Sequence, residues 1–230
     1  MVNETHEEGQ KITAQESFLK KEWALLVILI LPFILIAIYW NRIPDRVPMH
    51  WNIRGEVDNW GGKNSVIITP LINMGVALLL YFIPRIDPKK MNYPLFERAF
   101  RMVRLTLAAF VFAIFLLTVA PAMGVEVDAN TFIYTAIPLL FLIMGNFMRS
   151  FRQNFFAGIR TPWTLSSPEV WEKTHRLAAW LWTGGSVVFI VFRLIVGRWD
   201  YLPHVFLSYI GVLVIIPIVM SYVYYKQIKV

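Results

Sequence analysis

Six side chains that can recognise or transform a ligand lie within fourteen positions: His50, Trp51, Asn52, Asp58, Trp60 and Lys63. A carboxylate such as that of Asp58 can orient a histidine as a general base, and a nearby lysine can stabilise an anion. A second possibility is a metal site formed by His50, Glu56 and Asp58. The residue types alone therefore allow catalysis or metal binding in this stretch.

The same stretch, residues 41–63, also has features of a folded recognition surface. Pro44 and Pro48 restrict the backbone, Gly55 permits a turn, and tryptophans beside fixed polar groups are typical of binding surfaces. The stretch has one histidine and no nucleophile with an evident partner. We therefore expect a cap that recognises an extracellular peptide or a lipid, with no catalytic residue, metal or cofactor. A membrane enzyme that uses His50 and Asp58 remains an alternative.

A second group of distinctive residues lies further along the chain: Asn154, Gly158, Arg160, Thr161, Pro162, Trp163, Trp171, Thr174 and His175. Arg160 is a cation of fixed shape between two residues that control the backbone, which suits a carboxylate, a lipid phosphate or the carbonyls at a helix end. Trp171 and His175 are four residues apart and share one face of an expected helix. We expect a turn that packs the helices, and contact with lipid or docking of a cytoplasmic partner are both left open.

The elements that position these residues are predicted to be membrane-spanning helices. Hydrophobic residues make up 57% of the 230 residues and charged residues only 16%, which is typical of a polytopic membrane protein. Six apolar runs are long enough to span a bilayer, namely about 23–40, 66–84, 103–123, 131–148, 177–197 and 203–223. The predicted fold class is all-α. The absence of cysteine excludes disulfides and thiolate metal sites.

The distribution of positive charge predicts the orientation. Sixteen of the 22 lysines and arginines fall on the side that holds both termini, and six fall on the other side. Cytoplasmic loops carry the excess of lysine and arginine, so both termini and residues 149–176 are predicted to be cytoplasmic. Residues 41–63 are then extracytoplasmic. This bias also accounts for the net charge of +7, and direct binding of nucleic acid is not expected.

The predicted spans divide the chain into four segments. Residues 1–22 form a cytoplasmic tail, and residues 23–84 hold two spans around the outer stretch. Residues 85–148 hold an interfacial helix with spans three and four, and residues 149–230 hold the second motif with spans five and six.

A few polar residues lie within the predicted spans. Asn73 and Asn146, together with several prolines, leave open a small transporter or lipid-handling protein. Arg104 and Arg193 lie near span ends, where we expect their side chains to reach the interface.

Both distinctive stretches resemble parts of a known family. The run from Asn154 through Gly158-Ile159-Arg160-Thr161-Pro162-Trp163-Thr164 to Trp171 and Thr174 resembles the signature of the SdpI family of small multi-span membrane proteins. Residues 41–63 resemble the small domain of unknown function that precedes the SdpI module, through Pro44, Pro48, His50, Trp51, Asn52, Gly55, Asp58, Trp60 and Lys63.

This resemblance implies a function that the residues alone do not. The founding member confers immunity to a secreted peptide toxin that permeabilises the membrane, and it signals by holding a transcriptional repressor at the membrane. We therefore expect an integral membrane protein that acts in toxin immunity or membrane signalling. Its expected partners are membrane lipids, an extracellular peptide toxin and a cytoplasmic repressor protein.

Overall fold

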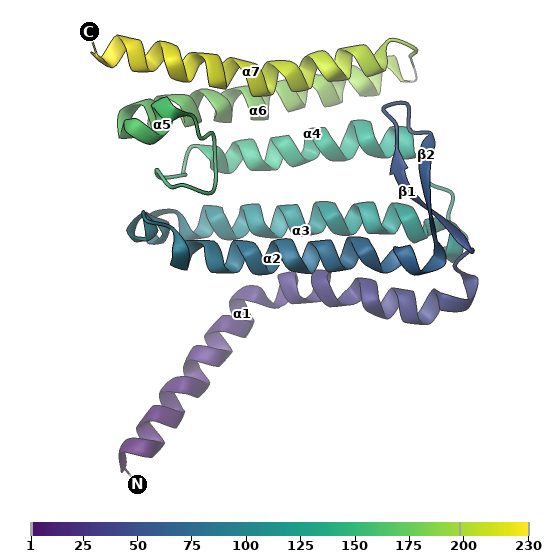
Figure 1. Cartoon of the computed structure of the whole chain (residues 1–230), viewed down its shortest axis with the longest axis horizontal. Helices are drawn as coiled ribbons and strands as arrows, with labels where there is room; N and C mark the ends of the chain where they lie inside the picture. The colour runs from purple at the N-terminus through teal and green to yellow at the C-terminus, as the bar shows by residue number, and fades with distance from the viewer. Residues whose placement is uncertain (1, 198, 230) are drawn as a thin grey trace.

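The long apolar runs fold as helices, because a helix satisfies its own backbone hydrogen bonds in lipid. The computed structural model of the chain describes residues 2–197 and 199–229 (Figure 1). The long helices are α1 (Val2–Tyr39), α2 (Ile68–Ile86), α3 (Glu97–Val119), α4 (Ala129–Met148), α6 (Pro168–Val196) and α7 (Leu202–Lys229). The short elements are η1 (Trp40–Arg42), β1 (Arg46–Trp51), β2 (Val57–Gly62), η2 (Lys63–Ile67), η3 (Lys90–Phe96), η4 (Ala120–Met123) and α5 (Pro162–Ser166).

The six predicted spans are confirmed. Within the described residues, six helical segments are long and apolar enough to cross a membrane, and each contains nearly all of one predicted run. The structure extends two of these segments beyond the prediction. The third starts at Lys90, because η3 runs directly into α3, and α6 begins at Pro168 because its capped start continues into the span. Residues 2–20, in the predicted tail, continue α1, whose first part projects away from the other helices (Figure 1).

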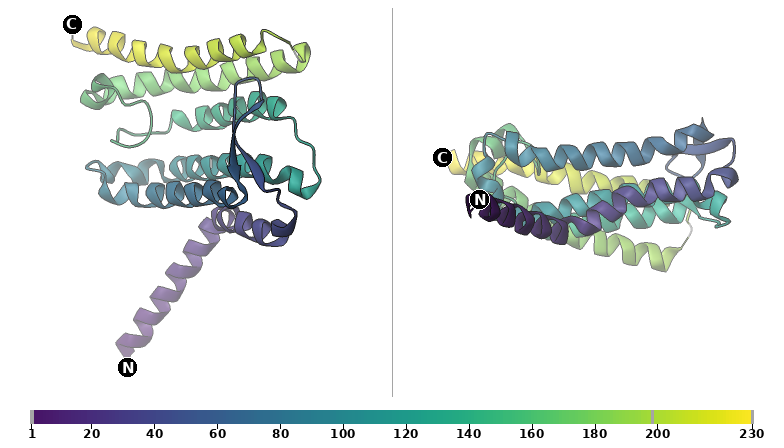
Figure 2. Two further views of the ribbon diagram at one scale, coloured as in Figure 1. Left: turned by 45° about the vertical axis from the view of Figure 1, so that its right-hand side comes forward. Right: turned by 90° about the horizontal axis from the view of Figure 1, so that it is seen from below.

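The six long helices form two halves. Helices α1, α2 and α3 pack together, and α4 packs against α6, which in turn packs against α7. Helices α3 and α4 join the halves side by side (Figures 1 and 2). The start of α1, the end of α7, the α2–α3 connection and residues 149–167 lie at one end of the molecule, here called the termini end (Figure 1). The β-hairpin lies at the opposite end, the hairpin end.

A proline in α7 is compensated by a side chain of α6. Pro217 has no N–H, so the carbonyl of Leu213, four residues earlier, loses its usual helical donor. The indole Nε1 of Trp182 donates to this carbonyl at 2.9 Å. Trp182 is held close to α4, because a Cβ at Gly145 would lie 2.7 Å from the Trp182 Cβ. This contact shows how a neighbouring helix can supply the bond that a proline removes.

Three polar residues that lie within or near the spans differ in their surroundings. Arg104 does not reach out to the interface as predicted, because its buried guanidinium forms an ion pair with Glu22 of α1. Asn73 is buried and donates to the carbonyl of Ala108 at 3.1 Å, whereas Asn146 is exposed. The two asparagines therefore do not line a common path, so this feature does not support a transporter.

Residues 46–62 form an antiparallel hairpin that the all-α prediction did not include. Arg46 pairs with Gly62 and Trp51 with Val57, and the register shifts on both sides of His50. A two-stranded hairpin has marginal stability alone. Here Val47 is buried in the core of the first half, among residues such as Phe115. Packing against the bundle therefore stabilises strands that are too short and irregular to show clear alternation in the sequence.

The Trp182–Leu213 bond predicts coupling between residues 182 and 217. Trp182→Phe should lower the free energy of unfolding by about 1 kcal/mol through loss of this hydrogen bond, in addition to any packing loss. In a Pro217→Ala background the new N–H can donate to Leu213, so the same substitution should cost less. Equilibrium unfolding of the four proteins in mixed detergent micelles measures this coupling as a double-mutant cycle. Strictly additive effects would contradict the assignment.

Candidate functional site

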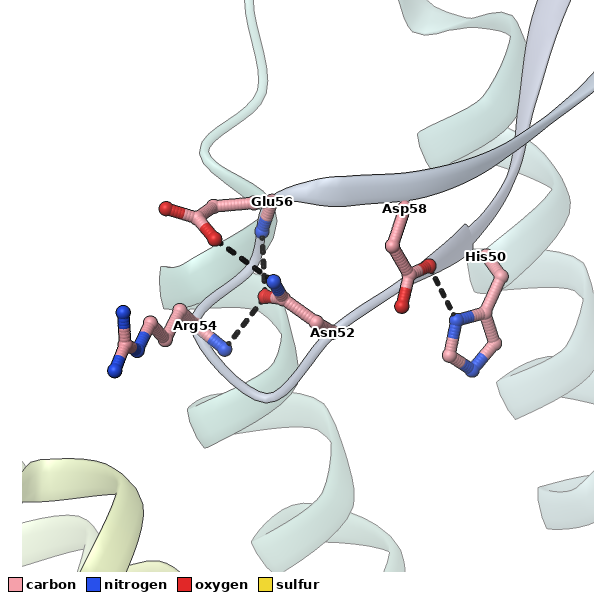
Figure 3. A network of polar contacts seen from close by, with 5 residues as sticks. All are labelled: His50, Asn52, Arg54, Glu56 and Asp58. Atoms are coloured by element: carbon pink, nitrogen blue, oxygen red, sulfur yellow. Dashed lines mark hydrogen bonds and ion pairs between the residues drawn. The ribbon is translucent and has the colours of Figure 1, made fainter.

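The hairpin brings His50 and Asp58 together on its exposed surface. The His50 Nδ1 lies 2.6 Å from the Asp58 Oδ1, and the two side chains are 67% and 43% exposed (Figure 3). The carboxylate fixes the orientation of the imidazole and leaves its Nε2 free of this bond. The pair is thus a preoriented hydrogen-bonding group that faces the medium at the hairpin end.

The turn of the hairpin is organised by the side chain of Asn52. Its Oδ1 accepts from the backbone N–H of Arg54 at 2.9 Å and of Glu56 at 3.1 Å. Its Nδ2 donates to the Glu56 carboxylate at 2.8 Å (Figure 3). Glu56 therefore belongs to the turn and not to a metal site with His50 and Asp58. Among the described residues, no three His, Cys, Asp or Glu side chains come together as metal ligands would.

The tip of the hairpin is attached to the second half of the molecule. Asn130 of α4 donates through its Nδ2 to the Arg54 carbonyl at 3.1 Å, and the Tyr134 hydroxyl donates to the Ile53 carbonyl. Gly55 has φ of +78°, and a Cβ there would lie 2.5 Å from the Asn130 nitrogen, so the close approach requires glycine. Because its base packs on the first half, the hairpin links both halves.

A cavity of about 510 Å³ lies beside the hairpin tip. Its lining comes from the tip, the start of α4 and the connection between α6 and α7, namely Arg54, Asp128, Asn130, Trp199, Asp200, Leu202 and Pro203. The lining combines a guanidinium, two carboxylates and an indole, which suits a peptide with charged groups. These residues were not predicted as a site, because they come from three segments far apart in the sequence.

The other predicted residues of the hairpin stretch do not join the His50–Asp58 pair. The Lys63 Nζ lies 4.8 Å from the ring centre of Trp40, which places it at the base of the hairpin. Trp60 is 48% exposed, and the Arg46 guanidinium lies 5.9 Å from its ring centre. Trp51 is half-buried at the end of β1. The described geometry therefore resembles an exposed binding surface more than a convergent catalytic site.

At the termini end, Asn154 organises the second distinctive stretch. Its side chain is fully buried, and its Oδ1 accepts from the N–H groups of Phe156 and Ala157 at 2.9 and 2.7 Å. Its Nδ2 donates to the carbonyls of Arg152 and Ala157. One amide therefore satisfies four backbone groups of a non-helical segment.

His175 holds the next part of this segment against α6. Its Nε2 accepts from the Ile159 N–H at 3.1 Å, and its Nδ1 contacts the Trp171 carbonyl at 2.8 Å. Nδ1 must therefore carry the proton, and the buried ring is neutral. Gly158 has φ of +104°, and a Cβ there would overlap the His175 Nε2. The His175 ring thus accepts a hydrogen bond from the backbone at Ile159. This contact requires glycine at position 158, because a larger residue there would collide with the ring.

Two threonines attach the segment to α5 and α7. Thr161 and Thr164 form a reciprocal capping box at the start of α5, where Pro162 occupies the first turn. The Thr161 hydroxyl also lies 3.0 Å from the Ser221 hydroxyl of α7, and Trp163 packs on Tyr222 with ring centres 5.0 Å apart. These packing and hydrogen-bonding contacts are a structural reason for the spacing of the four residues.

The first half contributes Asp87 to this arrangement, a residue that was not predicted. Its buried carboxylate accepts from the Tyr93 hydroxyl and from the Phe155 N–H, both at 2.9 Å. Gln153 accepts from Lys89 through its side chain and from Asn92 through its carbonyl. The segment from residue 150 to 167 therefore links the two halves at the termini end.

Two residues of the second predicted group, Arg160 in the segment and Thr174 in α6, remain outside the network. Arg160 is exposed and donates from its guanidinium to the Phe155 carbonyl at 2.8 Å. Thr174 is fully buried, and its hydroxyl has no hydrogen-bond partner among the described residues. The segment is chiefly a packed turn, and Arg160 is one of the exposed side chains on its surface.

The Asn154 network predicts a large loss of stability. Asn154→Leu should lower the free energy of unfolding by more than about 3 kcal/mol, because each buried N–H left without a partner costs about 1–3 kcal/mol. Asn146→Leu is the matched control, since Asn146 is exposed on α4. Equilibrium unfolding in mixed micelles compares them. Equal effects of the two substitutions would contradict the role of Asn154.

Comparisons with known proteins match both distinctive stretches. Residues 27–74 match a domain of unknown function, DUF1648, and residues 150–224 match the SdpI/YfhL protein family. Over 211 residues the chain is 24% identical to "Immunity protein SdpI" of Bacillus subtilis (strain 168), an alignment that covers 92% of this chain and 99% of that protein. No solved structure matches the chain significantly. The resemblance seen in the sequence is therefore confirmed, because residues 150–224 match the SdpI/YfhL protein family and most of the chain aligns with an immunity protein.

Proposed function

We propose that this protein confers immunity to a membrane-active peptide, which it recognises at the hairpin end. The observation that carries the proposal is the hairpin itself. Its base and tip are fixed on different halves, while His50, Asp58 and Trp60 stay exposed. A rigid, preoriented surface with an exposed indole loses little entropy on binding. The similarity to an immunity protein supports the same function.

The cavity beside the hairpin tip gives the proposed peptide a second point of contact. Asp200 and Trp199 suit a cationic side chain, through charge and through cation–π attraction. Arg54 on the opposite segment suits a peptide carbonyl or carboxylate. A peptide that lies along the hairpin would then contact the strands, α4 and the α6–α7 connection together.

The proposed orientation places the hairpin end outside the cell and both termini in the cytoplasm. The excess of lysine and arginine at the termini end supports it. The proposal also assigns a signalling surface to the termini end. Phe155 and Phe156 are 40% and 37% exposed, next to Arg152 and Arg160, and such aromatic and basic surfaces favour docking of a protein. A cytoplasmic repressor is the partner that the family resemblance implies.

The orientation has a direct test, because the chain has no cysteine of its own. A single cysteine introduced by Glu126→Cys lies in an exposed loop at the hairpin end, and Arg152→Cys lies in an exposed loop at the termini end. A membrane-impermeant thiol reagent should label the first in intact cells and the second only after permeabilisation. The reverse pattern would overturn the proposed orientation.

Immunity is tested by survival of a toxin-sensitive bacterial host. Cells that express the chain should survive higher concentrations of the peptide than cells with an empty vector. His50→Ala and Trp60→Ala should each weaken protection, since loss of a central interface residue lowers affinity by about tenfold or more. Both side chains are exposed, so the amount of protein in the membrane should stay the same.

Glu126→Ala is the control, because Glu126 is exposed at the hairpin end outside the hairpin. It should protect as well as the unchanged chain. No protection by the unchanged chain would exclude immunity to that peptide, whereas full protection by both hairpin variants would exclude the hairpin surface. The fraction of a repressor that sediments with membranes, measured in the same cells, reports signalling separately.

A further inference from the structure

A cavity of about 290 Å³ lies between α6, α7 and the segment that contains Arg160. Its lining consists of Gly158, Ile159, Arg160, Thr161, Trp182, Leu213, Val214 and Ile218. The cavity is distinct from the hairpin surface and lies on the termini side of the molecule. The roles described for the hairpin and for the Asn154 network do not use it.

The cavity runs from the level of residue 160 towards the middle of the membrane. His175, which bonds the segment, is seven residues into α6 and therefore about 10 Å from its start. Trp182 lies about 10 Å deeper along the same helix. Val214 and Ile218 on α7 are each 42% exposed and belong to a span, so they face lipid. One wall of the cavity is thus apolar and continuous with the lipid-facing surface.

Arg160 places a positive charge at the termini end of this apolar wall. Its two neighbours in sequence are fixed, since Ile159 donates to His175 and Thr161 contacts Ser221. The guanidinium has five N–H groups, and the contacts among the described residues use only one, to Phe155. The backbone at residue 160 is therefore fixed, and the guanidinium keeps donors for a ligand.

We infer that this cavity binds one anionic phospholipid, with its phosphate on Arg160 and an acyl chain between α6 and α7. A guanidinium forms strong paired hydrogen bonds with phosphate, and an apolar slot that opens to the bilayer takes a hydrocarbon chain. Basic pockets between spans commonly bind anionic headgroups. The bound lipid would connect the Arg160 segment to α7. This inference does not depend on the proposed immunity function.

The charge is tested with the full chain purified in detergent and mixed with equal amounts of phosphatidylglycerol and phosphatidylcholine. Native mass spectrometry counts the lipids that stay bound. The unchanged chain should retain phosphatidylglycerol in preference, and Arg160→Gln should reduce its apparent affinity by about tenfold through loss of charged hydrogen bonds. Arg152→Gln, which removes an exposed cation of the same loop outside the cavity, should have little effect.

The apolar slot is tested with two substitutions on the lipid-facing side of α7. Val214→Trp should fill the cavity and displace the bound lipid, whereas Val219→Trp should not, because Val219 is 51% exposed and does not line the cavity. Helical circular dichroism and elution volume confirm that each variant is folded.

Three outcomes would overturn the inference. Equal losses of phosphatidylglycerol in Arg160→Gln and Arg152→Gln would show only general attraction to a basic surface. Retention of the lipid by the Val214→Trp variant would show that the acyl chain does not occupy the cavity. Displacement of the lipid by millimolar inorganic phosphate would show a site for the free anion. The same variants can be assayed for survival with the peptide, which keeps the two proposals separate.

Discussion

The fold depends on one constraint, that backbone groups buried in the protein or in the membrane need hydrogen-bond partners within the protein. Regular helices satisfy it by themselves, and the departures from regular helix are where side chains become specialised. Trp182 donates to the carbonyl left free by Pro217. Asn154 and His175 together satisfy five backbone groups of the segment before α5. The residues that look most like a motif in this half therefore act first as hydrogen-bond partners for the chain itself.

This requirement explains why the two halves stay together at both ends. The hairpin follows α1 in sequence, yet its tip bonds to α4 of the second half. The segment at 150–167 belongs to the second half, yet it bonds to Asp87 and its neighbours in the first. Each half therefore contributes one connecting element, the hairpin or the 150–167 segment, that bonds to the other half. A ligand at the hairpin surface would act on an element that both halves share, which is a physical basis for responses that involve the whole bundle.

The six spans could be predicted from the sequence, because the length of an apolar run is a local property. The contacts of the sites could not. Asp87 stands before a proline and reads as part of a turn, and its bond to the Phe155 N–H joins residues 68 positions apart. Asn130 follows the helix cap Asp128, and nothing near it in the sequence indicates that it bonds to the hairpin. The residue types of His50 and Asp58 did point to a pair, whereas Lys63 lies against Trp40, because the strand geometry carries it to the hairpin base. Side chains that bond to distant backbone leave no periodic pattern.

The exchange of connections between the halves has a consequence for biogenesis. A ribosome makes the hairpin before α4 exists, so the hairpin tip has no partner until the fourth span enters the membrane. The segment around Thr161 likewise waits for Ser221, near the end of the chain. Insertion of the spans can proceed in order, but neither connection can close during the first half of synthesis. The final helix therefore completes a structure whose earlier parts were already in the bilayer. Truncation before α7 would remove the contacts of Thr161 and Trp163 with that helix, while the bonds of the segment to Asp87 and His175 could still form.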